Sequence, residues 1–443
     1  MEKLLIELKK IVEEDNLYQY NFFLYEWQTD FLRFYKSQSN YNITQKRKKL
    51  DFTMVKDKRK FSSSISDPTV EKVHEKIEDA KKVIGFLPKD NDFENFEDNK
   101  DIFEYRNLEN SIKKISLDKK INILKKITKV TDKYDFEIYG TFISLYRKGY
   151  FLNSSGLEKM YFVSPVMLET KAVSKKNNVS VINSYGGNDL SNFSLEDYIK
   201  QLELKISGAD LGIIDIEPGK YDVIISPQAL AEFLSYYCFG FYGQVLDKGR
   251  SFFEGKIDKK VLPDKVTINS TPQEEGMITY PYNGDGHIAR DTEFIKNGVF
   301  KNFVMDHYYS KKLNMEKNGS VGVAAIKMEK GDTSIEDMIR NTERGLYISN
   351  LHYMNFINMK ETSVTGLTRD GTFLIENGKI KNVVYNLRFT EKINDIFKNI
   401  VGIENKLYTI PSSNNYGDFS ISSSRVPHIK SKNFNISSST HTI

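Results

Sequence analysis

The sequence has 443 residues, which exceeds one ordinary domain and predicts two or three. Its 64 Lys and Arg against 60 Asp and Glu leave a net charge of only +4, which gives no reason to predict a nucleic-acid-binding protein. With 29 Phe and 26 Tyr the chain can build a large core, so a disordered protein is not expected. The single cysteine excludes an intrachain disulfide and a Cys-rich zinc or iron–sulfur site.

The first residues predict an amphipathic helix and not a targeting segment. Apolar residues recur there at helical spacing among charges: Leu4, Leu5, Leu8, Ile11 and Val12. No run of about 18 apolar residues occurs anywhere in the sequence, so no membrane-spanning helix is predicted. We therefore expect a soluble cytoplasmic protein.

Residues 1–210 predict a mixed α and β domain. Apolar residues at helical spacing predict helices at about 68–87, 117–131 and 195–208. Aromatic and β-branched runs predict strands in residues 18–35, a hairpin over 50–66 and short strands over 136–182. The acidic, interrupted stretch at 88–110 predicts a surface loop.

Residues 211–443 predict a β-rich domain. Strands are expected at 219–226, 261–268 and 297–306, and a terminal pair is expected after residue 417. The clearest hairpin signal is Glu376-Asn377-Gly378, which separates two apolar runs. The predicted fold class is therefore α+β, with a mixed N-terminal domain and a β-rich C-terminal domain.

Three helices are predicted inside this second domain, and the last is a short one over about 391–400. One covers residues 227–239: it follows a strand that stops at Pro227. One side of it is apolar, made of Leu230, Phe233, Leu234, Tyr237 and Cys238. Another begins at Ser334, with Asp337 three residues later, and is expected to stop at Gly345.

The histidines predict no metal site. The six are His74, His287, His307, His352, His428 and His441, and no two lie three, four or five residues apart, so no helix presents two imidazoles on one face. His74 is expected to be an exposed residue of a charged helix. His287 follows the turn Gly284-Asp285-Gly286, and His307 follows Asp306. A composite site built from these two histidines is an alternative, but we expect no metal in this chain.

Tests for other chemistry are equally negative. Cys238 lies on the apolar side of a helix, where a small buried core residue is expected and a reactive thiolate is not. The sequence has neither a G-x-S-x-G elbow nor a phosphate-binding G-x-x-x-x-G-K-[ST] loop. The basic runs at 46–49 and 56–60 predict the solvated face of a hairpin. These tests alone describe a non-enzyme.

The order of segments from residue 218 onward resembles the TldD/TldE (PmbA) family of two-subunit metalloproteases. The resemblance rests on PGKYDVIISPQALAEFL, KGRSFFEGKIDKKVLPDKVTI, YPYNGDGHIARDTEFIKNGVFKNFVMDHYYSKKLNM and GTFLIENGKIKNVVYNLRFTEKINDIFKNIVGI, which follow one another at consistent spacing. Together these stretches cover about half of the chain. The first half of the chain fits the family more loosely.

The resemblance also implies a subunit type. TldD-type subunits carry zinc on a helix with His-Glu-x-x-x-His and on a later Cys. Here the two His positions fall on Ala231 or Glu232 and on Tyr236 or Tyr237, and the late Cys position falls near Tyr416. The chain therefore resembles TldE, the subunit without its own zinc.

The family's acidic turn also differs here, because Asn283-Gly284-Asp285-Gly286 has lost acidic side chains. Substrate contacts in this region are therefore only candidates, and they are Tyr282, Asp285 and His287.

The resemblance implies a heterodimer in which a TldD-type partner holds the zinc and this chain completes the substrate cleft. Such proteases degrade unfolded peptides or trim leader peptides, and strand addition would suit an extended peptide. This chain would then be a pseudo-enzyme, which associates with a partner or with itself when alone. Two alternatives stay open: a self-standing peptide-binding or scaffold protein, and a homo-oligomeric hydrolase with a site around His287 and His307.

Overall fold

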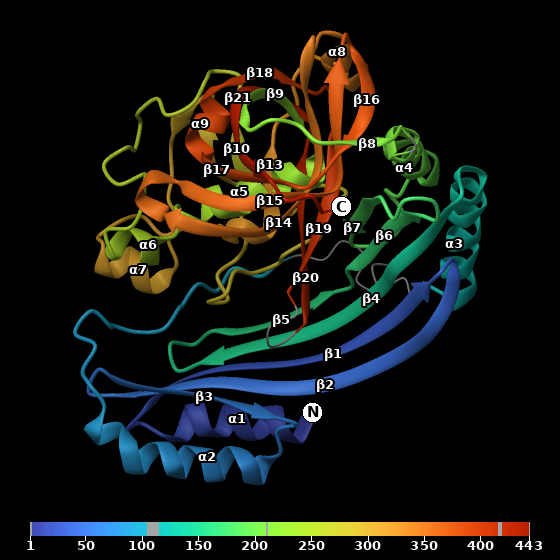
Figure 1. Ribbon diagram of the computed structural model, residues 1–443. Coiled ribbons are helices and arrows are strands. Elements are labelled where there is room, and N and C mark those ends of the chain that lie inside the picture. Colours follow the sequence, from blue (N-terminus) through green and yellow to red (C-terminus); the bar gives the residue numbers. More distant parts are fainter. Residues whose placement is uncertain (1, 104–114, 210, 415–418, 443) are drawn as a thin grey trace.

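The protein has an α+β fold, seen in a computed structural model that describes residues 2–103, 115–209, 211–414 and 419–442 (Figure 1). The strands form three sheets. One uses residues 19–187, and the other two use residues 213–439. None of the helices in these ranges is long and apolar enough to cross a bilayer.

The N-terminal sheet is long and curved, with strand order β3-β2-β1-β4-β6-β7, and β5 pairs with β4. Its strands are β1 (Gln19–Tyr35), β2 (Gln38–Lys56), β3 (Arg59–Ser66), β4 (Phe136–Asn153), β5 (Glu158–Val163), β6 (Val166–Ser174) and β7 (Ser180–Gly187). The predicted hairpin over 50–66 is confirmed, and its turn lies at Asp57 and Lys58.

The two faces of this sheet follow from the alternation of side chains along β1. Tyr20, Phe22 and Leu24 point to the face covered by α1 (Glu2–Glu14) and α2 (Val70–Val83), with η1 (Ile84–Phe86) at the end of α2 (Figure 1). Tyr25 and Trp27 point to the opposite face, where the C-terminal half packs.

The C-terminal half contains two further sheets. The first has the order β12-β11-β10-β13-β20-β19, and the second has the order β14-β9-β21-β17-β15-β16-β8, with β18 on β21. Because β14 also pairs with β15, the strands β14, β9, β21, β17 and β15 close into a ring. The strands are β8 (Ile213–Ile214), β9 (Gly219–Ile225), β10 (Ile268–Ser270), β11 (Thr292–Lys296), β12 (Val299–Phe300), β13 (Ile326–Met328), β14 (Arg344–Asn358), β15 (Ser363–Glu376), β16 (Lys379–Val384), β17 (Leu387–Lys392), β18 (Ile400–Ile403), β19 (Tyr408–Asn414), β20 (Ser420–Val426) and β21 (Ile429–Ser439).

Helices join and cover these sheets. They are α3 (Leu117–Thr131), η2 (Asp132–Tyr134), α4 (Leu195–Ala209), α5 (Pro227–Phe239), α6 (Gly243–Asp247), α7 (His307–Lys312), η3 (Gly322–Ala325), α8 (Ile335–Arg340), η4 (Met359–Glu361) and α9 (Ile393–Lys398). The predicted helices at 117–131 and 227–239 match α3 and α5 at both ends.

Several predicted elements of the second half are shorter or different. The strand expected over 261–268 reaches only residues 268–270, and the one expected over 297–306 covers only residues 299–300. Ser334 caps α8 as predicted, but that helix ends at Arg340 and Gly345 lies inside β14. The terminal strands β20 and β21 are present, but they belong to different sheets.

The two halves share apolar contacts. Ile278 and Ile421 of the C-terminal half pack in one cluster with Trp27, and the rings of Phe31 and Phe419 lie 5.3 Å apart. A larger cluster joins α3 and α4 to the ring of strands through Phe373 and its neighbours. The N-terminal sheet and the two C-terminal sheets therefore use residues on either side of residue 210, but these hydrophobic clusters include residues of both halves. The domain boundary at this position stays a prediction.

Candidate functional site

Helix α5 occupies the place where the family resemblance puts a zinc-binding helix. Ser226 caps its N-terminus by accepting a hydrogen bond of 3.3 Å from the Ala229 N–H, and Pro227 occupies the first turn, where a missing N–H costs nothing. Leu230, Phe233 and Leu234 are fully buried in the C-terminal core. The apolar side predicted from the sequence is therefore the packed side of the helix.

The positions expected to replace zinc ligands divide between the core and its margin. Tyr237 lies in the core, where its hydroxyl donates a hydrogen bond of 2.7 Å to Oδ1 of Asn394. Ala231 and Tyr236 lie at the margin of the core, and the Tyr236 hydroxyl donates to the main-chain oxygen of Met354. The Ala231 side chain has no atom that can bind a metal. The hydroxyls of Tyr236 and Tyr237 are both hydrogen-bonded to oxygen atoms of the protein. These residues do not fit the zinc of the family.

Glu232 is the one carboxyl on this helix. Burial raises its pKa to about 7, and no ion pair or hydrogen bond joins it to another residue of the described ranges. The pKa of the neighbouring Tyr236 is also raised. The larger cause is burial, and the smaller one is the charge of Glu232. Cys238 is buried on the core side and burial raises its pKa, so its thiol is not poised as a nucleophile. The position expected near Tyr416 lies outside the described residues.

The three candidate substrate contacts come together in one turn. The side-chain oxygen of Asn283 accepts hydrogen bonds of 3.0 Å from the N–H groups of Asp285 and His287, which fixes the turn. Between them, Gly286 has a φ of +86°, and a Cβ there would meet Leu157 at 2.8 Å, so the position requires glycine.

The three side chains of this turn face different surroundings. The Tyr282 ring packs against aromatic rings of β4 and β5, and its hydroxyl accepts from the Phe103 N–H at 2.9 Å. Asp285 accepts from the His307 N–H at 2.9 Å, whereas His287 points toward Glu97. These residues are neighbours in the chain, but their side chains point to different surroundings and do not form one site.

A cavity of about 350 Å³ lies on the Asp285 side of the turn. Its lining is rich in tyrosine and carries two carboxyls: Tyr242, Tyr280, Tyr282, Asp285, Asp306 and Tyr309. Burial raises the pKa of Asp285 to about 6, and the neighbouring Asp306 contributes; burial also raises the pKa of Asp306. Asp306 caps α7 by accepting from the Tyr309 N–H at 2.7 Å, so both carboxyls support the start of that helix.

Sequence reasoning missed Glu97, a buried carboxylate that joins the two halves. Lys317 lies 2.8 and 2.9 Å from its two oxygens. Burial disfavours the charged form, but the neighbouring His287 ring, the Lys317 ammonium group and the Asn99 N–H outweigh burial and lower the pKa of Glu97 to about 2. No periodic pattern in the sequence marks such a residue, because its partners lie about two hundred residues away.

Both histidines of the composite-site alternative lie beside this carboxylate. Nδ1 of His287 is 3.4 Å from one oxygen of Glu97, and Nδ1 of His307 is 3.6 Å from the other. His74, by contrast, is half-exposed on α2 and lies 2.7 Å from Glu7, as expected for a surface histidine.

The acidic stretch expected as a surface loop is anchored by ion pairs. Its described part, residues 88–103, has no helix or regular strand, and it runs from α2 toward the C-terminal half (Figure 1). Acidic residues along it lie close to basic ones elsewhere. The pairs are Asp90 with Lys60 at 2.6 Å, Asp92 with Lys312 at 3.2 Å, Glu94 with Lys311 at 3.1 Å and Asp101 with Arg290 at 2.9 Å.

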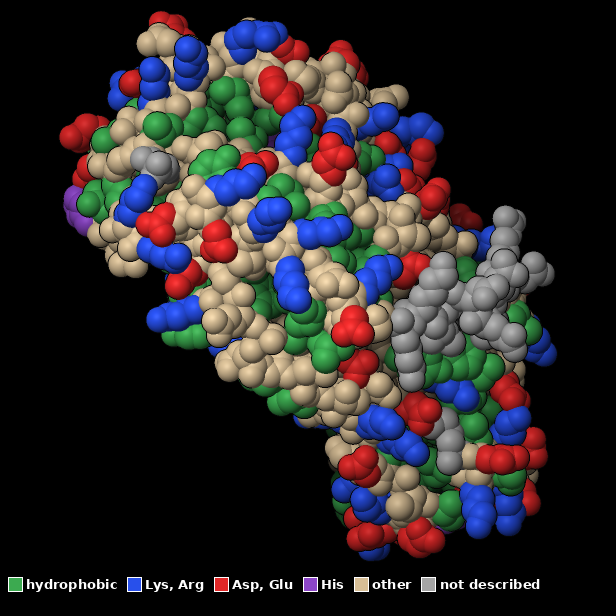
Figure 2. Space-filling view, turned by 90° about the vertical axis from the view of Figure 1, so that its right-hand side faces the viewer, with side chains coloured by type: hydrophobic (Ala, Val, Ile, Leu, Met, Phe, Trp, Pro, Cys, Tyr) green, Lys and Arg blue, Asp and Glu red, His purple; other side chains and the backbone are tan. Residues whose placement is uncertain are grey.

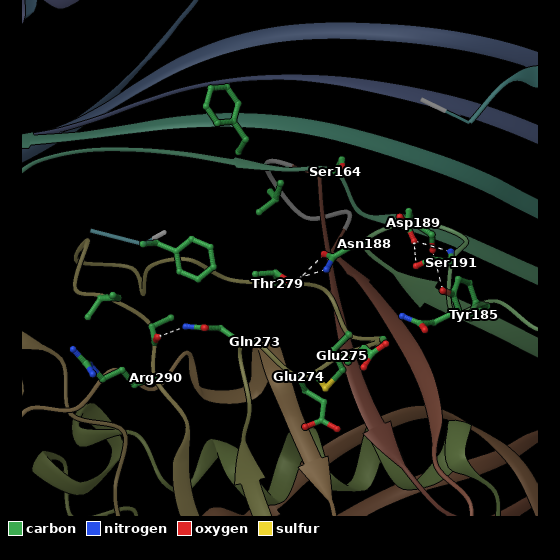
Figure 3. A pocket seen from close by; sticks show the side chains of 18 of the residues that line it. Ser164, Tyr185, Asn188, Asp189, Ser191, Gln273, Glu274, Glu275, Thr279 and Arg290 are labelled. Atoms are coloured by element: carbon green, nitrogen blue, oxygen red, sulfur yellow. Dashed lines mark hydrogen bonds between the residues drawn. The ribbon is translucent and has the colours of Figure 1, made fainter. Parts of the chain in front are cut away.

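A larger cleft of about 870 Å³ lies between the two halves. One wall comes from β5, β7 and the loop after β7, and the other comes from residues 273–279 and 288–290. Asn188 crosses the cleft: its amide oxygen accepts from the Thr279 N–H at 2.8 Å and its amide nitrogen donates to the Thr279 hydroxyl at 2.7 Å (Figure 3). Arg290, Glu274 and Asp189 add charges of both signs to its lining.

The basic runs at 46–49 and 56–60 do not form a concentrated positive surface. Lys49 lies 3.0 Å from Asp51, and Lys60 lies 2.6 Å from Asp90. On the face drawn in Figure 2, basic and acidic side chains interleave. These runs belong to a hairpin, β2 and β3, as the sequence predicted.

Residues 218–438 match the family model of the "PmbA/TldA metallopeptidase C-terminal domain". The chain belongs to the PmbA/TldD family. Among curated members of the family, Metalloprotease PmbA of Escherichia coli O157:H7 is 23% identical over 61% of this chain and 60% of its own. A protein named Metalloprotease from Methanothermobacter thermautotrophicus is 22% identical over 42% of this chain and 43% of its own. The chain thus spans about half the length of these curated relatives.

The family's fold covers the whole chain. The crystal structure of TldE from Thermococcus kodakarensis superposes with a TM-score of 0.84 over 99% of this chain and 100% of its own, at 20% identity. The resemblance to the TldE/PmbA type is confirmed by these names, and the α+β fold of the PmbA/TldD type is confirmed by the superposition.

Proposed function

We propose that this chain is the TldE/PmbA-like, zinc-free subunit of a heterodimeric metalloprotease, and that it works in the cytoplasm. The observation that carries the proposal is the composition and packing of α5. Its ligand positions hold Ala231 or Glu232 and Tyr236 or Tyr237, and Tyr237 is committed to the core through Asn394. A TldD-type partner would hold the zinc, which activates a water molecule for attack on a peptide bond.

Glu232 supports the same proposal by its surroundings. A glutamate that acts as general base must be ionised and must lie beside the water it deprotonates. Burial without a cationic partner holds Glu232 protonated for much of the time near neutral pH. None of the ligand positions on α5 holds a histidine, so this chain offers no zinc-bound water for Glu232 to deprotonate.

The cleft between the halves supports a substrate-holding role. It is open, about 870 Å³ in volume, and lined by apolar, amide and charged side chains from both halves (Figure 3). Such a lining suits an extended peptide, because main-chain hydrogen bonds supply affinity with little demand on sequence. Unfolded peptides and leader peptides are the substrate classes we propose for the pair.

Reconstitution tests the proposal. The chain is mixed with a TldD-type subunit, the mixture is separated by size-exclusion chromatography, and cleavage of an unfolded peptide is measured for each chain alone and for the pair. We expect a stable complex that cleaves, and no cleavage by this chain alone. Peptide binding without pairing would instead favour a self-standing peptide-binding protein.

A further inference from the structure

His307 presents a buried nitrogen that lacks a hydrogen-bond partner. Its Nε2 lies 3.0 Å from the side-chain oxygen of Asn95, an acceptor, so the ring proton resides on Nε2. In the neutral ring Nδ1 is then also an acceptor. This Nδ1 is buried, only 9% of the side chain is exposed, and it has no hydrogen-bond partner among the described residues.

A charged atom close to this nitrogen is itself an acceptor. Nδ1 of His307 faces a carboxylate oxygen of Glu97 at 3.6 Å, and Nδ1 of His287 faces the other oxygen at 3.4 Å, again without a hydrogen bond. Two acceptors that face each other in a buried place repel unless a cation lies between them. The arrangement therefore calls for positive charge on the histidine side of Glu97.

The separation between His307 and Glu97 is too long for a hydrogen bond and is close to that of two ligands of one metal ion. A direct N–H···O bond spans about 2.7–3.2 Å, which is shorter than both distances. Two ligands on one tetrahedral zinc, at about 2.0–2.2 Å from the metal, lie about 3.3–3.5 Å apart. Asp98 would supply a third ligand, because ligand atoms of Glu97, Asp98 and His307 all lie within 4.8 Å of one another.

We propose that Glu97, Asp98 and His307 bind a divalent transition-metal ion, with His287 beside it on the second oxygen of Glu97. A mixed imidazole and carboxylate set suits zinc and its first-row neighbours. Asn95 would act as the outer partner that holds the His307 ring in the required tautomer. The ion would tie residues 95–98 of the segment between the halves to the start of α7.

Lys317 is the competing cation. Its ammonium group lies within hydrogen-bond distance of both Glu97 oxygens and already neutralises the carboxylate. About a quarter of its side chain is exposed, so it can turn toward solvent when a metal takes its place. The proposal therefore includes a competition in which the metal weakens the pair between Lys317 and Glu97.

This inference goes beyond the proposed function and does not rest on it, because the site lies on other elements than α5. It would correct the sequence-based expectation that this chain binds no metal. The ion would be structural, since it would join two segments of the chain and no step of peptide cleavage is assigned to it.

Titration of the full-length, metal-free chain with zinc chloride in a calorimeter tests the site. We expect one zinc per chain and a melting temperature that rises with zinc concentration, because a ligand of the folded state stabilises it. Asp98→Asn and His307→Ala should each weaken binding by about tenfold or more, since even outer-shell changes cost about 10–100-fold. Lys317→Met should tighten it.

His74→Ala is the matched control, because this histidine lies on α2, where its ring pairs with Glu7 and not with Glu97 or Asp98. It should bind zinc as the unchanged chain does. Asp98 is exposed, so Asp98→Asn keeps the test valid if His307→Ala fails to fold. The proposal is overturned if the chain shows no saturable zinc binding, or if Asp98→Asn and His74→Ala bind equally well, which would place the zinc elsewhere on the surface.

Discussion

The Tyr237 hydroxyl donates a hydrogen bond of 2.7 Å to Oδ1 of Asn394, and both side chains are buried. This contact joins α5 to α9 at a position where the family's zinc helix is expected to carry a ligand. The ring of Tyr237 is also surrounded by Phe241, Phe253 and Phe397 at centroid distances of 5.1–5.9 Å. The tyrosine is therefore part of the core and is not available to a metal.

Tyr237→Phe should lower the free energy of unfolding by about 1–3 kcal/mol, because it leaves the buried Asn394 oxygen without this donor. Urea denaturation followed by circular dichroism measures the change. Tyr41→Phe removes a hydroxyl from an exposed residue and should alter stability by no more than about 0.5 kcal/mol. Equal effects of the two substitutions would show that the buried contact contributes nothing.

Phe233→Ala should destabilise the protein by about 3–5 kcal/mol through the cavity it leaves. Phe233 is fully buried on α5, with the ring of Phe389 5.6 Å away. Phe239→Ala, the same change at a position 40% exposed on this helix, should cost clearly less. Denaturant midpoints of the two variants provide the comparison, and a small loss for Phe233→Ala would mean that the packing role of α5 is overstated.

Glu232 should make the stability of the protein depend on pH. Because burial raises its folded pKa to about 7 from an ordinary value of 4.5, the folded state holds the proton over a range in which the unfolded state has lost it. Stability therefore falls as pH rises from about 4.5 to about 7 and then levels off.

Glu232→Gln removes this dependence. Relative to the unchanged protein, the variant should gain about 1–3 kcal/mol between pH 5 and pH 8. Unfolding free energies of the two proteins at both pH values measure the gain. A constant difference between them at all pH values would indicate that Glu232 titrates normally and is in contact with water.

Trp27 reports on the contact between the two halves. It is the only tryptophan of the sequence, it is 5% exposed, and it packs in one cluster with Ile278 and Ile421. Because the core clusters join both halves, we expect its fluorescence and the circular dichroism signal to change at the same denaturant concentration. An earlier fluorescence transition would show that the halves separate before they unfold, and it would favour the domain boundary near residue 210.

Local signals explain which elements the sequence predicts well. Ser226 and Pro227 mark the start of α5, and Asn377-Gly378 marks the turn between β15 and β16, where both residues have positive φ. These signals act within a few residues. Gly345 indicated a false helix end for the same reason: its place is set by a strand partner, Asp222 of β9, and not by the helix before it.

The contacts of Glu97 show why part of the site could not be predicted. It lies in an acidic stretch whose composition is typical of a surface loop. Its partners His287, His307 and Lys317 come from a distant part of the chain, and only the packing of the two halves brings them together. The sequence offered His287 and His307 as an isolated pair, but no local pattern pointed to the carboxylate between them.

The central claim is that α5 packs and does not catalyse, and one measurement tests it most directly. Peptide cleavage is compared for the reconstituted pair with unchanged chains, with Glu232→Gln in this chain, and with the glutamate of the His-Glu-x-x-x-His helix changed to glutamine in the partner. The account predicts full cleavage with Glu232→Gln and none with the partner variant. Loss of cleavage by a folded, paired Glu232→Gln chain would contradict it.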